Sequence, residues 1–146
     1  MVGVIDTEGA CAEWTFPGEL GAVRSARHAV RDALRTWRVD PSVCDLAVLL
    51  VSELVTNSLR YASGPVGVRL TRLGQETEQE EERSAGGPAL LVEVSDPLPE
   101  PPHTRPAGPD DEGGRGLQLV ACSARRWGTR KGASGKAVWF ELPLPG

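Results

Sequence analysis

A glutamate and an asparagine, one helical turn apart, are the first residues in this 146-residue sequence that could do chemistry. Glu53 and Asn57 are four positions apart, so a helix would project both side chains from one face. Their neighbours Leu50, Leu54 and Val55 are apolar. Polar groups beside an apolar stripe need partners, because burying each one unpaired costs roughly a few kcal/mol. A cation with phosphates would supply them, and so would an interhelical hydrogen-bonded pair or water at a helix edge.

A carboxylate ends an apolar run further along the chain. Residues 90–95 have the character of a strand, and Asp96 follows them directly before a proline. A carboxylate at the end of a strand can accept a hydrogen bond from an exocyclic amine, worth about 1.5–3 kcal/mol when one partner is charged. Aspartate also commonly ends strands as a turn-former, so the position fits either role.

Glycines precede a short amphipathic pattern at Gly114 and Gly116. The pattern over 116–124 predicts a helix. Glycines immediately before a helix let backbone N–H groups approach an anion at the helix N-terminus. A flexible hinge before a helix has the same composition, and both interpretations stay open here.

Two common phosphate-binding motifs are excluded. A Walker A loop ending at Lys136 would need a glycine where Arg130 stands, and Ala137 occupies the position of its Ser or Thr. The dinucleotide fingerprint is also absent, because the glycines of 114–116 lack a third partner and follow a loop rather than a strand.

The helices and strands that must position these residues can be predicted from the spacing of the hydrophobic residues and from the glycines and prolines that interrupt it. Helices are predicted over 20–37, 41–62 and 116–124, and strands over 13–16, 66–73, 90–95, 126–130 and 137–142. Asp40 is the expected N-cap of the second helix, with Pro41 at its first position. The order predicts an α+β fold: a two-layer sandwich of a mostly antiparallel sheet with helices on one face.

One domain is expected over 12–146, after a disordered or loosely ordered N-terminus at 1–11. Mobile loops are expected at 74–88, which is polar and rich in glutamate, and at 97–113, which holds six prolines. The first cannot bury a core. The second is long enough to be a lid or a binding loop.

Charge and composition exclude several classes of protein. The net charge is −4, and residues 76–83 carry all of it, so no dense basic patch for nucleic acid is expected. Three cysteines without paired spacing favour neither a disulfide framework nor a zinc site, which indicates a reducing cytosol. Residues 1–10 lack the features of a signal peptide, and the strongest apolar run, 46–51, is too short for a bilayer. A cytoplasmic protein without a membrane partner is expected.

Arginines recur along the predicted helix 20–37, mostly away from its apolar side. They are Arg24, Arg27, Arg31, Arg35 and Arg38. A solvated face explains them, and a docking surface for an acidic partner is the alternative.

Taken together and in this order, the three segments resemble the N, G1 and G2 boxes of the GHKL (Bergerat-fold) ATPase superfamily. The similarity is greatest to the small single-domain anti-sigma-factor serine/threonine kinases. It is carried by Glu-Leu-Val-Thr-Asn-Ser-Leu-Arg-Tyr-Ala at 53–62 and Gly-Gly-Arg-Gly-Leu-Gln-Leu-Val at 113–120. The ending at 135–142 is similar to that family's last strand, and the resemblance runs from about residue 14 to 142.

The resemblance implies a site for ATP and Mg²⁺. Asn57 would coordinate the Mg²⁺ that bridges the phosphates. Glu53 would act as general base toward a serine hydroxyl of a partner protein, which is sound chemistry for a carboxylate within hydrogen-bond reach. Asp96 would accept a hydrogen bond from the adenine amino group.

The resemblance also implies how the phosphates are held. Gly114 and Gly116 would direct their amides to the phosphates, with Arg115 or Lys136 as charge partners. Binding of ATP therefore involves segments that are far apart in the sequence.

The chain departs from the family pattern near the base. The family usually has Asp-x-Gly-x-Gly, whereas Asp96 is followed by Pro97 and Pro99. Glycines there would allow close approach to the base, and prolines do not. Ala137 stands near the last strand where the family often has Thr or Ser, and Tyr61 where many relatives have histidine. These departures favour binding over efficient turnover.

The function that the resemblance implies is an ATP-dependent serine/threonine protein kinase that phosphorylates an anti-sigma-factor antagonist and could also hold a sigma factor. The alternatives are a catalytically weak regulatory module that binds nucleotide or partner only, and the catalytic half of a split histidine kinase. A homodimer is expected because relatives dimerise.

Overall fold

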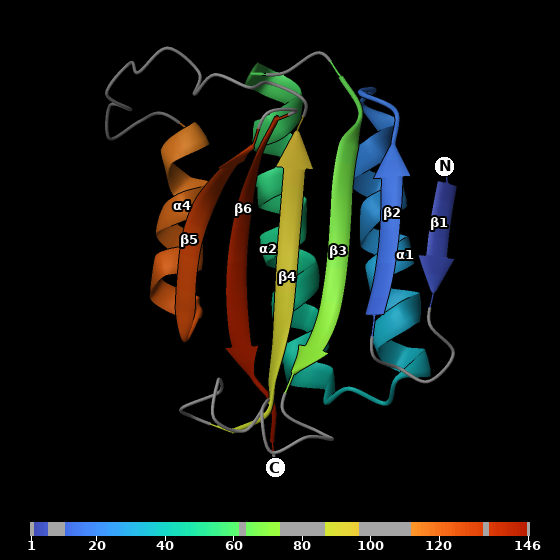
Figure 1. Ribbon diagram of the computed structural model, residues 1–146, viewed down its shortest axis with the longest axis vertical. Helices are drawn as coiled ribbons and strands as arrows, with labels where there is room; N and C mark the ends of the chain where they lie inside the picture. The colour runs from blue at the N-terminus through green and yellow to red at the C-terminus, as the bar shows by residue number, and fades with distance from the viewer. Residues whose placement is uncertain are drawn as a thin grey trace.

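Helices and strands form two layers in the computed structural model of the chain (Figure 1). The structure describes residues 2–5, 11–61, 64–73, 87–96, 112–132 and 135–145. The helices are α1 (Gly21–Thr36), α2 (Pro41–Tyr61) and α4 (Glu112–Ser123). The strands are β1 (Val2–Ile5), β2 (Cys11–Phe16), β3 (Val66–Leu73), β4 (Ala89–Asp96), β5 (Arg126–Gly132) and β6 (Gly135–Pro143).

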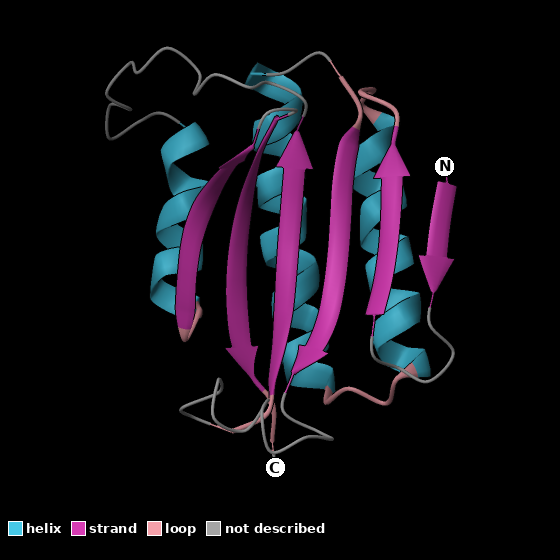
Figure 2. Cartoon of the chain, viewed as in Figure 1, coloured by secondary structure: helices cyan, strands magenta, loops and turns pink. Residues whose placement is uncertain are grey.

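The six strands make one sheet in the order β1-β2-β3-β4-β6-β5, and each neighbouring pair is antiparallel. The three helices cover one face of it (Figure 2). The predicted α+β sandwich is therefore confirmed. We call the other side of the sheet, which no described helix covers, the open face.

Alternation along the strands separates the two faces, because successive side chains point to opposite sides of a sheet. In β4, Leu90, Val92 and Val94 are buried under the helices, whereas Glu93 and Ser95 belong to the open face. Asp96 continues the buried series and so lies on the helix side of the sheet, at its end. The position of each polar residue in this alternation therefore decides on which side of the sheet its side chain lies.

Helix α2 lies in the middle of the helical layer and contacts α1, α4 and β4. Its start is the expected one: the Asp40 carboxylate accepts a hydrogen bond of 2.9 Å from the Ser42 amide. By length and composition the stretch Pro41–Arg60 could cross a membrane, a test that buried core helices also pass. Leu50, Val51 and Val55 are fully buried in the core, as in a core helix.

Helix α1 buries alanine, valine and leucine side chains, and its arginines lie elsewhere. Of the five arginines in and just after α1, Arg31 is half-buried and the others are exposed. Both interpretations of this basic face remain compatible with the fold.

Two features differ from the sequence expectation. Residues 2–5 form a strand paired with β2, where a loosely ordered N-terminus is expected. Helix α4 begins at Glu112, four residues before the predicted start, since helix propensity disfavours its glycines but does not prevent the turn. Most of the two expected loops, 74–86 and 97–111, lies outside the described residues.

Candidate functional site

Three candidate segments meet at one end of the sandwich. The C-terminal half of α2, the C-terminal end of β4 and the N-terminal end of α4 all lie at the upper end in Figure 1. Contacts of α2 with both β4 and α4 support this arrangement. The fold thus gathers residues that are up to about sixty positions apart in the sequence.

Asn57 carries an unusual polar atom. Its side-chain oxygen Oδ1 is buried and accepts no hydrogen bond from the described residues. Such an acceptor costs the folded protein about 1–3 kcal/mol. Glu53, one turn earlier on α2, is half-buried like Asn57. The pair therefore offers two side-chain oxygens from one side of the helix.

A cation fits this donor set. Mg²⁺ prefers oxygen ligands, and it usually combines one or two protein oxygens with phosphate oxygens and water. Within the described part of the chain, no three His, Cys, Asp or Glu side chains gather to hold a metal by themselves. The partnerless oxygen of Asn57 suits a metal that arrives together with a phosphate ligand.

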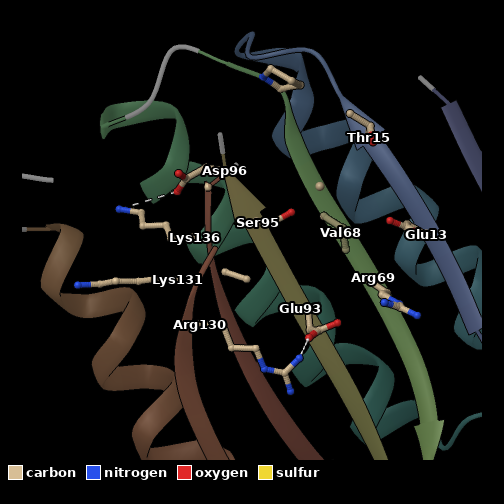
Figure 3. Close-up of a pocket in the computed structure, with 14 residues that line it drawn as sticks. Glu13, Thr15, Val68, Arg69, Glu93, Ser95, Asp96, Arg130, Lys131 and Lys136 are labelled. Atoms are coloured by element: carbon tan, nitrogen blue, oxygen red, sulfur yellow. Dashed lines mark hydrogen bonds and ion pairs between the residues drawn. The ribbon is translucent and has the colours of Figure 1, made fainter. Parts of the chain in front are cut away.

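Asp96 ends β4 with its carboxylate nearly buried, at 7% side-chain exposure. Its partner across the sheet is Lys136 of β6, whose Nζ lies 3.9 Å from Asp96 Oδ2. Figure 3 shows the two side chains turned toward one another at the end of their strands. The sequence places Lys136 with the phosphates, whereas the structure puts its ammonium beside the carboxylate expected to read the base.

The glycines of the third segment lie inside α4 rather than before it. Because the helix begins at Glu112, the amide of Gly114 is among the N–H groups without an intrahelical acceptor. The amide of Gly116 faces the carbonyl four residues earlier, at Glu112. Of the two glycines, Gly114 is therefore the better placed to offer its N–H to an anion, and the helix dipole adds to that attraction.

A hollow of about 500 Å³ lies over the open face, and its lining includes Asp96 and Lys136, where β4 ends and β6 begins. Its floor is the row of small residues Gly67, Ser95 and Ala137, which are register neighbours on β3, β4 and β6. Charged side chains stand around it, and Figure 3 shows Arg130 reaching Glu93. Neither Glu53 nor Asn57 lines this hollow.

The charges around the hollow are largely paired with each other. Arg130 donates a hydrogen bond of 2.7 Å to Glu93 and lies 5.7 Å from the centre of the Trp139 ring. The pKa of the Arg69 guanidinium is raised, first by its hydrogen bond to the Cys11 side chain and then by nearby carboxylates that include Glu93. Glu13, Arg69, Glu93 and Arg130 thus form a network on the open face in which opposite charges offset each other.

Sequence reasoning missed the network on the open face. Glu13, Arg69 and Glu93 are register partners on three adjacent strands. Each is unremarkable in the sequence, and only the pairing of the strands brings them into one row. The alternation of buried and exposed residues within each strand was the available signal, but it does not reveal the order of the strands.

Comparison with known proteins was consistent with this geometry. A family model described as "Histidine kinase-like ATPase domain" matches residues 16–142. No curated protein sequence matches the chain. Among solved structures, the fold is similar to that of the RsbU and RsbW domains of Rv1364c from Mycobacterium tuberculosis, with a TM-score of 0.62 and 17% identity. That alignment covers 92% of this chain and 32% of the other, so this chain spans about a third of that protein's length.

Proposed function

This chain belongs to the histidine kinase-like ATPase family, and from that membership we propose that it is an ATP-binding regulatory protein that phosphorylates a serine or threonine of a partner protein. The observation that carries the proposal is the buried Oδ1 of Asn57, which accepts no hydrogen bond from any described residue and lies one helical turn from Glu53. An oxygen of this kind is costly in an empty protein and useful to a cation bound with phosphates.

Each side chain near α2 has a role in the proposed reaction. Asn57 would hold the Mg²⁺ through Oδ1, and the bound metal would supply positive charge beside the phosphates. The hydroxyl oxygen of the partner forms a bond to the γ-phosphorus, the bond from that phosphorus to the β–γ bridging oxygen breaks, and ADP leaves. Glu53 takes the hydroxyl proton as the new bond forms.

The remaining residues bind and orient the nucleotide. Asp96 accepts the hydrogen bond of the adenine amino group from its position at the end of β4. The amide of Gly114 faces the phosphates at the start of α4, with Gly116 allowing the helix to come close. Arg115 is the proposed charge partner of the phosphates at this helix end.

The proposed partners are an anti-sigma-factor antagonist, as the phosphorylated protein, and a sigma factor, as a protein that the domain holds. The likeness of 53–62 and 113–120 to the anti-sigma-factor kinases supports this choice. The fold shared with a structure that contains an RsbW domain is consistent with it. We further propose a homodimer that works in the cytoplasm, without nucleic acid or membrane as a partner.

Thermal unfolding with and without Mg-ATP tests the nucleotide site. A ligand at a hundred times its Kd stabilises the folded state by about 2.7 kcal/mol, which raises Tm by roughly 5–10 °C for a domain of this size. The shift should need magnesium and should be lost in Asn57→Ala. Ser58→Ala is the matched control, since it truncates the next residue of the same helix and should keep the shift.

Absence of any shift at millimolar Mg-ATP would overturn the nucleotide site. In that case the domain would act through protein contacts alone, the reading that the prolines at 97 and 99 favour. A shift that is equal in the parent protein and in Asn57→Ala would leave ATP binding intact but remove Asn57 from it.

A further inference from the structure

The ion pair at the end of β4 and β6 joins a carboxylate to an ammonium on the helix side of the sheet. Asp96 and Lys136 are register partners, and on their strands they alternate in step with the buried apolar residues, which on β6 are Phe140 and Leu142. Their side chains are 7% and 22% exposed. The two charges are therefore held together in a sheltered corner, at the place where the proposed function puts the base.

The distance between the two charged groups leaves the Lys136 ammonium able to donate a hydrogen bond to a ligand. A charge-assisted hydrogen bond from nitrogen to oxygen is about 2.7–2.9 Å long. Lys136 Nζ lies 3.9 Å from Asp96 Oδ2, close enough for attraction but too far for a direct hydrogen bond. Among the described residues Nζ makes no hydrogen bond, and its three protons can turn to another acceptor.

A carboxylate next to an ammonium matches one edge of adenine. The Watson–Crick edge presents the 6-amino group, which donates, beside the ring nitrogen N1, which accepts. The carboxylate of Asp96 complements the first group, and an ammonium complements the second.

We propose that Lys136 is a second base-reading residue, which donates a hydrogen bond to N1 of the purine while Asp96 accepts from the 6-amino group. The inference rests on the proposed function and moves Lys136 from the phosphates to the base. The competing interpretations are a phosphate contact and a cross-strand ion pair that only supports the sheet.

Binding affinities of Lys136→Met for a set of nucleotides separate these interpretations. The set is ATP, AMP and 1-deaza-ATP, in which carbon replaces N1, and calorimetric titration gives each Kd. A hydrogen bond to a charged group corresponds to about tenfold or more in affinity. We expect Lys136→Met to weaken ATP and AMP alike by about this factor and to leave 1-deaza-ATP unchanged.

Lys131→Met is the matched control. Lys131 is the register partner of Lys136 on β5 and is exposed, so its loss removes the same charge from the same end of the sheet. It should leave all three affinities unchanged. Melting of the two variants without nucleotide shows whether either substitution disturbs the fold.

Three outcomes would overturn a part of this inference or all of it. Weaker binding of ATP with unchanged binding of AMP would assign Lys136 to the phosphates. Equal weakening of ATP and 1-deaza-ATP would show that N1 is not its target, leaving a structural ion pair. If the parent protein binds neither ATP nor 1-deaza-ATP, the proposed function itself fails, and the role of Lys136 fails with it.

Discussion

Substitutions of Glu53 and of Asn57 should have different effects on the binding of Mg-ATP and on its turnover. Glu53→Gln keeps the shape of the side chain but cannot take a proton. We expect it to lower ADP formation by about 10²–10⁴-fold while the stabilisation by Mg-ATP persists. ADP release by the purified protein, with water as the acceptor, measures the first quantity, and melting measures the second. Loss of both would make Glu53 a binding residue rather than a base.

The packing of Trp139 requires a glycine at position 128, because any side chain there would collide with the indole ring. A Cβ atom there would lie 2.9 Å from three ring atoms of Trp139, closer than real contacts allow. Gly128→Ala should therefore displace the indole and lower the free energy of unfolding by about 1–3 kcal/mol, as overpacking does. Urea denaturation measures the change. Gly21→Ala is the control, because a Cβ there meets nothing within 4 Å. Equal stability of the two variants would contradict the packing of Trp139.

At the scale of elements, the cap of α2 holds the helix that carries Glu53 and Asn57. A hydrogen bond from the Ser42 hydroxyl is the largest cause that lowers the pKa of Asp40 below its usual 3.8, followed by the Ser42 amide. Because the folded pKa is the lower one, the contribution to stability is present above about pH 4 and fades as the pH falls through the folded value.

Asp40→Ala should accordingly lower Tm at pH 7, and the difference from the parent protein should shrink as the pH falls below about 4. Melting curves of both proteins over this range give the comparison. Asp40→Asn keeps an acceptor oxygen for the cap and should lose less at pH 7. A Tm difference that does not change with pH would show that the charge of Asp40 is irrelevant to the cap.

Most helices and strands could be predicted from the sequence, because the hydrophobic residues within each of them recur at the spacing typical of that element. Strand β3 was predicted with its observed bounds, since it alternates and lies between clear breakers. Strand β1 could not be, because four residues form a strand only when β2 is there to pair with them. The start of α4 was placed too late because local propensity penalises its glycines.

At the scale of the whole molecule, the site depends on strand order. The residue types at positions 53, 57 and 96 suggested their chemistry because each has a local pattern. The approach of Lys136 to Asp96 had no such signal, since it requires β6 to lie between β4 and β5. A sequence reveals which residues can react more readily than which residues meet, because meeting is decided by non-local pairing.

The buried oxygen of Asn57 has a consequence for engineering. An apolar side chain of similar size at this position would remove an acceptor that no described residue satisfies, and such replacements are often neutral or stabilising. Selection for heat resistance alone would then favour changes that abolish the proposed metal ligand. The proposed metal binding by Asn57 would therefore oppose the thermal stability of the domain, a conflict that is common at functional sites.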